Sequence, residues 1–393
     1  MYLPAKRHLY SEANEITNGI VNNGILTPRP FYAVGHNTNS IEEVINCLAA
    51  GGNAIEPDVN VYTNNPDELC ISHLEGSDNA PPLRDFLKSL HRVAKQNEQL
   101  ALVIFDCKKG ATTPAFGIKL LEGIRELLTF DVDLNFIISV SNVEEAWMFE
   151  GISSTLGARG GLVIDEMDDP VAVYNYFQKA GVINQCYGNG MSLPGITILD
   201  PEILPSIERA CALRAVQDIP KFIYAWTVND EALQREFIRI GVDGIFTDEM
   251  PSLIKRVHEP EFHSVIRMAN RSDNPFTPPN AAYGLAVHTA NKSFAGTDAN
   301  ITFTLTGANG SSEVIVNTKL RSRMERNQWN YITLQSRDLG ELTSLTVQRD
   351  NKGKAPDWYL DKIIVESSLY KTSKTATFNQ DINQTSPFTK SLY

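Results

Sequence analysis

The sequence predicts a two-domain α/β protein in which a (β/α)8 TIM barrel is followed by an all-β sandwich. Three observations support this prediction. Short apolar segments alternate with amphipathic helical segments between residues 31 and 247, the stretch Asn270–Asn280 is rich in Pro, Asn and Asp, and only short alternating segments follow it. Alternating strands and helices indicate a parallel sheet, whereas many short strands with polar turns indicate a sandwich.

The barrel prediction rests on eight apolar or β-branched segments separated in most cases by helical ones. An open doubly wound sheet is the alternative, but no G-x-G-x-x-G follows the first strand to favour it. The predicted strands are Phe31–Val34, Ala54–Val59, Leu100–Phe105, Phe136–Val140, Gly161–Ile164, Val182–Cys186, Phe222–Val228 and Gly244–Thr247. The predicted helices are Ser40–Ala50, Leu83–Ala94, Ala115–Leu128, Pro170–Ala180, Pro201–Ala215 and Asp230–Ile240.

The remaining domain boundaries follow from changes in composition. Residues 1–30 are polar and form a predicted lead-in, the barrel spans 31–277, the sandwich spans 278–368, and the Ser/Thr/Asn-rich residues 369–393 form a predicted polar, poorly ordered tail. The predicted sandwich strands are Tyr283–His288, Ile301–Leu305, Glu313–Val316, Tyr331–Leu334, Ser344–Gln348 and Asp361–Val365.

Composition excludes several classes of protein. Hydrophobic residues make up 42% and charged residues 21% of the 393 positions, which is ordinary for a globular chain. The net charge of −12 argues against a nucleic-acid partner. The charge is uneven: residues 261–393 carry 15 basic and 12 acidic side chains, and residues 1–260 carry the other 20 and 35. The contrast supports two domains of different electrostatic character.

The cysteines and the N-terminus bear on the compartment. The five cysteines are widely spaced and form no C-x-x-C motif, which argues against a disulfide framework. The sequence still allows one or two disulfide bridges. No apolar run approaches the roughly 18 residues of a membrane helix. The first ten residues lack the apolar region of a signal peptide. These features fit either a cytosolic protein or the mature form of an exported one.

Acidic residues at predicted strand ends suggest a metal site. Active sites of (β/α)8 barrels lie at the carboxyl ends of the strands. Glu56 and Asp58 are two positions apart on one strand, so both side chains are expected on the same side, and Asp106 ends the next strand. Buried carboxylates repel one another unless a cation balances them, and an all-oxygen set favours Mg²⁺. Lys108, two residues beyond Asp106, is expected to hold an anionic oxygen.

Two histidines and a tryptophan complete the candidate set. His36 follows the first strand, His73 follows a short apolar segment soon after the second, and Trp226 lies on the seventh. Imidazoles suit proton transfer near neutral pH, so these residues together suggest phosphoryl-group chemistry. Each residue alone has a simpler interpretation, as a surface ion pair, a loop residue or a core aromatic, and only their co-occurrence at strand ends favours the catalytic one.

The motifs resemble the sphingomyelinase D / phospholipase D toxin family, relatives of the glycerophosphodiester phosphodiesterases, over about residues 31–277. The resemblance implies that His36 and His73 are the catalytic acid/base pair, that the three carboxylates bind Mg²⁺, and that Lys108 and Trp226 line the phosphate and head-group pocket. It also implies attack by the substrate's own hydroxyl, with release of choline and formation of a cyclic phosphate. The motifs that carry it are GHN at 35–37, GNAIEPDV at 52–59, His73, VIFDCK at 103–108, YAWTV at 224–228, GVDGI at 241–245 and IRMANRSDNPF at 266–276, the last resembling a segment that closes the far end of the barrel.

Departures from the family pattern concern the loop after His73. The venom enzymes carry a cysteine-bridged loop there, and this chain has LEGSDN at 74–79 instead, so choline specificity is left open. His36-Asn37 and Asp106-Cys107-Lys108 favour the toxin-like branch over the general phosphodiesterases, which usually have His-Arg and Glu-x-Lys at these places.

The second domain resembles the PLAT (lipoxygenase-homology) sandwich. The matching pieces are AGTDA at 295–299, DLG at 338–340, RDNKG at 349–353 and PDWYL at 356–360. The resemblance implies docking on a membrane surface or lipid-bearing partner, with Ca²⁺ as a further candidate ion. Taken together, the sequence predicts a secreted, monomeric lipid phosphodiesterase of the phospholipase D type with a phospholipid or sphingolipid substrate. The alternatives are a soluble, cytoplasmic glycerophosphodiester phosphodiesterase and a non-catalytic lipid-binding protein.

Overall fold

A computed structural model describes residues 28–74, 78–191, 203–263, 265–277, 282–318, 323–336, 338–370 and 373–393. The predicted lead-in therefore lies outside the described residues up to position 27, and residues 29 and 30 already belong to the first strand. Among the described residues, no helix combines the length and the apolar character needed to cross a bilayer.

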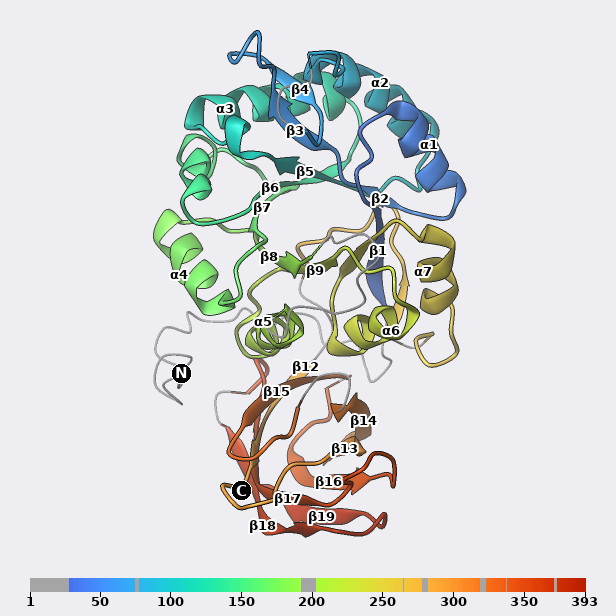
Figure 1. Ribbon diagram of the computed structural model, residues 1–393, viewed down its shortest axis with the longest axis vertical. Coiled ribbons are helices and arrows are strands. Elements are labelled where there is room, and N and C mark those ends of the chain that lie inside the picture. The colour runs from blue at the N-terminus through green and yellow to red at the C-terminus, as the bar shows by residue number, and fades with distance from the viewer. Residues whose placement is uncertain are drawn as a thin grey trace.

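The first domain is a closed barrel of parallel strands within a ring of helices (Figure 1). Pro57 divides the second barrel strand into β2 and β3, because proline cannot donate a ladder hydrogen bond. The barrel closes because β1 pairs with β10 on one side and with β2 on the other. The barrel strands are β1 (Arg29–Gly35), β2 (Ala54–Ile55) with β3 (Asp58–Val61), β5 (Leu102–Cys107), β6 (Asn135–Val140), β7 (Gly160–Ile164), β8 (Gln185–Gly190), β9 (Phe222–Trp226) and β10 (Gly244–Thr247).

The surrounding helices match the six predicted ones, and one further helix, α7, follows the last barrel strand. β6 is followed by a 3₁₀ segment, η3 (Glu145–Gly151), and α3 ends in a π-helical turn, η2 (Ile124–Leu128). The helices are α1 (Ile41–Ala49), α2 (Leu83–Gln96), α3 (Pro114–Gly123), α4 (Pro170–Ala180), α5 (Ile203–Gln217), α6 (Glu231–Ile240) and α7 (Met250–Val257), with short elements β4 (Leu69–Ile71), η1 (Lys109–Ala111) and β11 (Ile266–Met268) beside them.

Local residues explain where several helices begin and end. Ser40 and Glu43 form a capping box at α1, and the Asp230 carboxylate accepts the first amides of α6. Gly181 and Gly241 end α4 and α6 in the left-handed conformation that glycine adopts without strain.

The barrel interior is packed, and the segment after β11 closes its amino end as the resemblance implied. Phe276 and Ala269 belong to the interior apolar cluster together with Tyr224 and Phe246. The buried Asn53 amide fastens this segment by donating to the Ala269 carbonyl at 2.9 Å. The carboxyl end of the barrel is therefore the open one.

The second domain is a sandwich of two four-stranded antiparallel sheets, ordered β15-β12-β17-β18 and β14-β13-β16-β19. Trp358 is fully buried in its core. The strands are β12 (Ala282–Thr289), β13 (Asn300–Gly307), β14 (Gly310–Asn317), β15 (Trp329–Gln335), β16 (Leu342–Arg349), β17 (Trp358–Glu366), β18 (Lys374–Ile382) and β19 (Phe388–Ser391).

The prediction of a poorly ordered tail is wrong. β18 pairs with β17, and β19 pairs with β16, so the last residues supply one strand to each sheet. The segment is polar on one face only: Ala376, Phe378 and Ile382 are buried in the sandwich core. Composition hid this alternation, because threonine is a good strand former as well as a polar residue.

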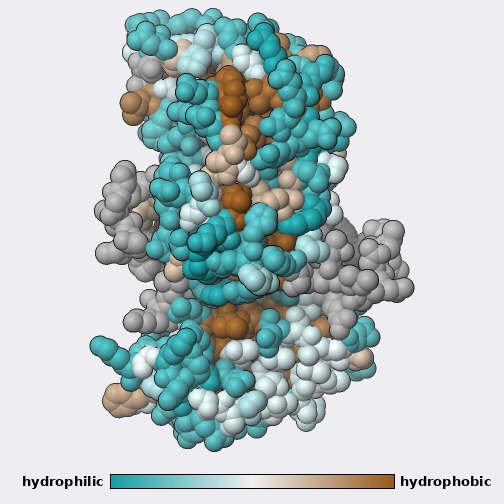
Figure 2. Space-filling model, turned by 90° about the vertical axis from the view of Figure 1, so that its right-hand side faces the viewer, coloured by the Kyte–Doolittle hydropathy of each residue, from teal (hydrophilic) through white to brown (hydrophobic). Residues whose placement is uncertain are grey.

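Helix α5 joins the two domains. It packs against β12 and β15, and Figure 1 shows the sandwich next to α5 and α6. A buried ion pair between Arg323 and Glu208, 2.6 Å apart, crosses the contact. At the other end of α5, the Ser368 amide donates to the Ala215 carbonyl at 2.8 Å. Because α5 is buried on both sides, the sandwich is an integral part of the packing of the barrel. Figure 2 shows the side of the molecule with α1 and α7 as a mainly hydrophilic surface with hydrophobic patches.

Candidate active site

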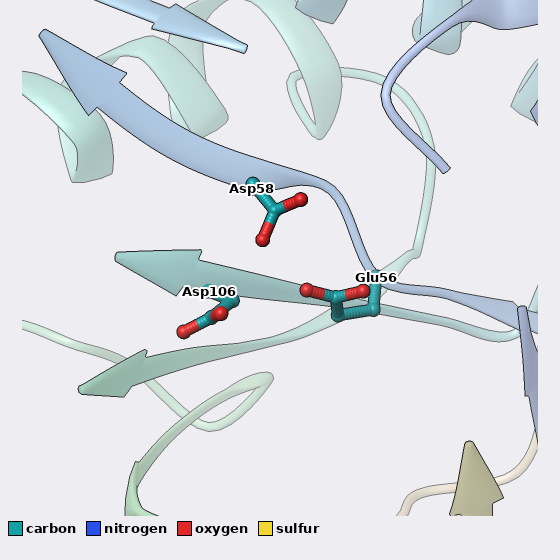
Figure 3. Close-up of side chains that lie close together, drawn as sticks. All are labelled: Glu56, Asp58 and Asp106. Carbon is teal, nitrogen blue, oxygen red and sulfur yellow. The ribbon is translucent and has the colours of Figure 1, made fainter. Parts of the chain in front are cut away.

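Three carboxylates converge at the carboxyl ends of neighbouring barrel strands. Glu56 follows β2, Asp58 opens β3, and Asp106 near the end of β5 pairs in register with Asp58. One oxygen of each lies within 4.8 Å of the others. Figure 3 shows the three carboxylates gathered around a common space. Among the described residues they are the one group of three or more His, Cys, Asp or Glu side chains close enough to share a metal ion.

Electrostatics make this cluster unfavourable by itself. Burial, and then the charges of Asp58 and Asp106, raise the pKa of Glu56 well above its ordinary value. Burial also raises the pKa of Asp106, although Lys108 opposes the effect. Carboxylates held in this way lower their free energy by binding a proton or a cation.

Lys108 compensates part of the negative charge. Its ammonium nitrogen lies 2.6 Å from Asp58 Oδ1 and also contacts the Asp106 carboxylate. Burial alone would lower the pKa of Lys108, but the two carboxylates outweigh burial and raise it. Burial likewise opposes ionisation of Asp58, but Lys108 outweighs it, so the pKa of Asp58 is lowered. When all three carboxylates are ionised, two negative charges remain, which equals the charge of one divalent cation.

The loop after β1 positions two of the carboxylates. The backbone N–H of Asn37 donates to Glu56 Oε2 at 2.7 Å. The Asn39 side chain donates to Asp58 Oδ2 at 2.6 Å, and its own oxygen accepts the Asp58 amide at 2.8 Å. Asn37 was left unassigned on sequence and Asn39 was missed, although both stand in the loop after a barrel strand, where site residues are expected.

Both predicted histidines lie beside the cluster and use the same ring nitrogen for a carboxylate. His36 Nδ1 is 2.8 Å from Asp248 Oδ1, and His73 Nδ1 is 3.3 Å from the Asp58 carboxylate. An ionised carboxylate can only accept a hydrogen bond, so each Nδ1 carries the hydrogen and each Nε2 is left for other contacts. His73 is half exposed, whereas His36 is mostly covered.

Asp248 is a site residue that sequence reasoning left unassigned. Asp248 follows β10. The Asn229 side-chain N–H donates to Asp248 Oδ2 at 2.8 Å, and Asn229 Oδ1 accepts from the backbone N–H of Asp248. The hydrogen bond from His36 lowers the pKa of Asp248. A carboxylate fixed in this way sets the orientation and tautomer of the imidazole.

Trp226 belongs to a second polar group inside the mouth. Its indole N–H donates to the Asp165 carbonyl at 3.0 Å. The Asp165 carboxylate accepts from Tyr224 at 2.6 Å and from Ser139 at 2.8 Å. Burial, and then the Asp106 charge, raise the pKa of Asp165 to about 8. Asp165 was also left unassigned, and its place directly after β7 was the available signal.

The cysteines form no disulfide bridge. All five are free and buried, and all lie in the described part of the chain. Cys107, between Asp106 and Lys108, packs into the core, because alternate residues of a strand point to opposite faces.

Comparison with known proteins now decides the family. The family model of dermonecrotic toxin SPH matches residues 27–276, well over half of the chain. The chain belongs to the dermonecrotic toxin SPH family. The PLAT/LH2 domain model matches residues 283–386, which includes β18 and therefore extends beyond the predicted limit at 368.

Curated relatives match the same part of the chain over almost their whole length. A dermonecrotic toxin of Loxosceles rufescens is 28% identical over 62% of this chain and 98% of its own length, and one of Loxosceles apachea is 26% identical over the same shares. Among solved structures, an Oleispira antarctica phosphodiesterase covers 58% of this chain and 97% of its own at 11% identity and a TM-score of 0.44. The predicted membership is confirmed, and with it the enzyme class, a phospholipase D-type phosphodiesterase.

Proposed function

We propose that this enzyme is a Mg²⁺-dependent, sphingomyelinase D-like phosphodiesterase that releases a choline-type head group from sphingolipids or lysophospholipids. The observation that carries the proposal is the buried set of Glu56, Asp58 and Asp106, with His36 and His73 beside it at one barrel mouth. Membership of the dermonecrotic toxin SPH family supports the same reaction class.

The donor set fits a hard divalent cation. All three candidate ligands are carboxylates, and burial, followed by the charges of Asp58 and Asp106, raises the pKa of Glu56, so a bound cation would favour the ionised cluster. Oxygen donors of this kind suit Mg²⁺, with water completing its coordination. When bound, Mg²⁺ would stabilise negative charge on the non-bridging phosphate oxygens.

The imidazoles supply proton transfer. Each histidine uses Nδ1 for a carboxylate, so each Nε2 is available to the substrate. One imidazole accepts the proton of the substrate's own hydroxyl as that oxygen attacks phosphorus. The other donates a proton to the choline oxygen as its bond to phosphorus breaks. The products are a cyclic phosphate and choline, and the two histidines exchange their protonation states.

Two further side chains position the substrate. Lys108 is held by Asp58 and Asp106, so its ammonium group can bind an anionic phosphate oxygen. Trp226 is anchored through its indole N–H, which leaves the ring as the surface for a quaternary ammonium group.

Phosphorus NMR of the products from sphingomyelin and lysophosphatidylcholine tests the reaction. A cyclic phosphate and free choline are expected, with activity lost in EDTA and restored by Mg²⁺. His36→Ala and His73→Ala should abolish release without lowering the melting temperature, and His258→Ala, an exposed histidine on α7's carboxyl end, is the matched control. Normal turnover by either active-site variant would refute the assignment.

The same assay separates the alternatives. Faster choline release from glycerophosphocholine than from sphingomyelin would indicate the soluble glycerophosphodiesterase. Co-sedimentation with liposomes without head-group release from any substrate would indicate a non-catalytic lipid-binding protein.

The cellular setting is part of the proposal. The PLAT match supports contact with a membrane surface through the sandwich, and the toxin names of the Loxosceles relatives support secretion. A monomer is proposed, with light scattering of the full chain as the test. Ca²⁺ in the sandwich stays a prediction, which calorimetric titration of the full chain with Ca²⁺ would check.

A further inference from the structure

The loop after β1 carries a buried side-chain oxygen that lacks a hydrogen-bond donor. Asn37 Oδ1 accepts no hydrogen bond from any described residue, although it is shielded from solvent. Other asparagine oxygens at the mouth are satisfied: Asn39 Oδ1 accepts the backbone N–H of Asp58, and Asn229 Oδ1 accepts that of Asp248. A buried acceptor without a donor costs free energy unless a water molecule or an ion completes it. Asn37 Oδ1 therefore needs a partner that the described chain does not supply.

The backbone at Asn37 adopts an uncommon conformation that fixes the residue against Glu56. Its φ of 52° lies in the left-handed region, which asparagine tolerates better than most residues other than glycine. In this conformation the Asn37 N–H donates to Glu56 Oε2 at 2.7 Å, and the next N–H, of Thr38, donates to the Glu56 carbonyl at 2.9 Å. Backbone strain of this kind concentrates at functional sites.

This anchoring keeps the Asn37 carboxamide beside the carboxylate cluster. A few covalent bonds join the backbone nitrogen of Asn37 to Oδ1, so the two atoms lie within about 5 Å of each other. Glu56, which accepts that nitrogen's hydrogen, shares its site with Asp58 and Asp106 (Figure 3). The Asn37 side chain is only partly covered, so water can reach it from the mouth.

A neutral oxygen suits this position. The three ionised carboxylates and Lys108 already leave the two negative charges that one divalent cation balances. An amide oxygen adds an acceptor without adding charge. Mg²⁺ in proteins usually keeps several water molecules, whose hydrogens need acceptors, and groups that hold such water tune the affinity for the ion.

We propose that Asn37 is a positioning residue of the metal site, whose Oδ1 accepts a hydrogen bond from a water molecule on the Mg²⁺ that the three carboxylates bind. Asn37 would then act twice, because its backbone N–H orients the ligand Glu56 and its side chain orients the hydration of the ion. This inference rests on the proposed function, of which the ion is a part.

Calorimetric titration of the full chain with Mg²⁺ tests the inference without any turnover. Asn37→Gly removes the carboxamide but keeps the N–H that holds Glu56, and glycine adopts a φ of 52° without strain. This variant should bind Mg²⁺ about ten-fold or more weakly than the original chain. Asn37→Asp keeps an oxygen acceptor and tolerates the same conformation, so it should bind Mg²⁺ at least as tightly as the original chain.

Asn327→Gly is the matched control. Asn327 also lies in the left-handed region, with φ of 56°, but it is exposed in the loop before β15 of the sandwich. This variant should keep the original Mg²⁺ affinity. In EDTA, the melting temperature should change as little for Asn37→Gly as for Asn327→Gly, because the Asn37 oxygen has no hydrogen bond to lose among the described residues.

Four results would overturn the inference. They are unchanged Mg²⁺ affinity of Asn37→Gly, an equal loss of affinity in Asn327→Gly, weaker binding by Asn37→Asp than by Asn37→Gly, and a large fall of the melting temperature in EDTA confined to Asn37→Gly. The last result would assign the carboxamide to the metal-free fold instead.

The proposed function fails separately. Mg²⁺ binding that depends on Asn37, without head-group release from any substrate, would retain this inference and refute the proposed function. Head-group release with Mg²⁺ binding that is independent of Asn37 would do the reverse. Absence of Mg²⁺ binding by the original chain would refute both.

Discussion

Replacing Glu56 with glutamine should affect stability and metal binding in opposite directions. The amide keeps the shape of the side chain and can still accept the Asn37 N–H, but it removes one of three clustered charges. At the 4.8 Å limit of the cluster, each like-charged pair costs about 0.9 kcal/mol with the dielectric constant of water and about 3.5 kcal/mol with an effective value of 20. Glu56→Gln should therefore stabilise the metal-free protein by about 1–3 kcal/mol at neutral pH.

The dependence on pH follows from the raised pKa of Glu56. Its folded pKa lies above the unfolded value, so the original protein takes up a proton on folding and loses stability as pH rises above the ordinary carboxyl range. Glutamine does not titrate. The advantage of Glu56→Gln should be absent near pH 4 and should grow toward neutral pH.

Thermal unfolding in EDTA and in Mg²⁺ measures both effects. A gain of about 2–4 °C in melting temperature for each kcal/mol is expected in EDTA. In Mg²⁺ at about 100 times its dissociation constant, the original protein should gain about 2.7 kcal/mol and the variant almost none, which reverses their order. Glu122→Gln, an exposed change on α3, is the control. A lower melting temperature of Glu56→Gln in EDTA, or full stabilisation of it by Mg²⁺, would refute the reasoning.

Three further predictions concern other contacts. Asp248→Ala should lower kcat for head-group release about ten-fold or more with little change in KM, because His36 loses the acceptor that orients it; unchanged kcat would contradict this role. Arg323→Met should destabilise the chain by about 3–5 kcal/mol in denaturant unfolding, because it breaks the buried ion pair with Glu208 by removing one of its members; a loss below about 1 kcal/mol by the same measure would show that the pair is unimportant. A thiol reagent should titrate none of the cysteines in the folded protein and all five after denaturation, and a lower count in the denatured chain without reductant would reveal a disulfide.

Much of the site was accessible from sequence because a closed parallel barrel gathers all strand ends at one mouth. The order of strands along the chain is also their order around the barrel, so Glu56, Asp58 and Asp106 were expected to be neighbours before any coordinates. The expectation about backbone was less accurate. Glu56 and Asp58 do not lie on one continuous strand, because Pro57 divides it, yet both side chains reach the same space.

Other residues could not be assigned from sequence because their partners are distant along the chain. Asp248 is 212 positions from His36, and Tyr224 is 59 positions from Asp165. An isolated aspartate after a strand reads equally well as a loop residue or a helix cap, and only the contact distinguishes these interpretations.

The amino-acid order alone determined the alternation of strands and helices, the helix caps, and the chemistry available at the barrel mouth, because these depend on short-range periodicity and on residue type. Tertiary structure decided which carboxylate contacts which imidazole, that the polar C-terminal segment completes both sheets, and that the sandwich packs on α5 with a buried ion pair across the contact. These outcomes depend on contacts between segments that are separate in the chain, up to 212 positions apart for His36 and Asp248, where burial and pairing outweigh local preference.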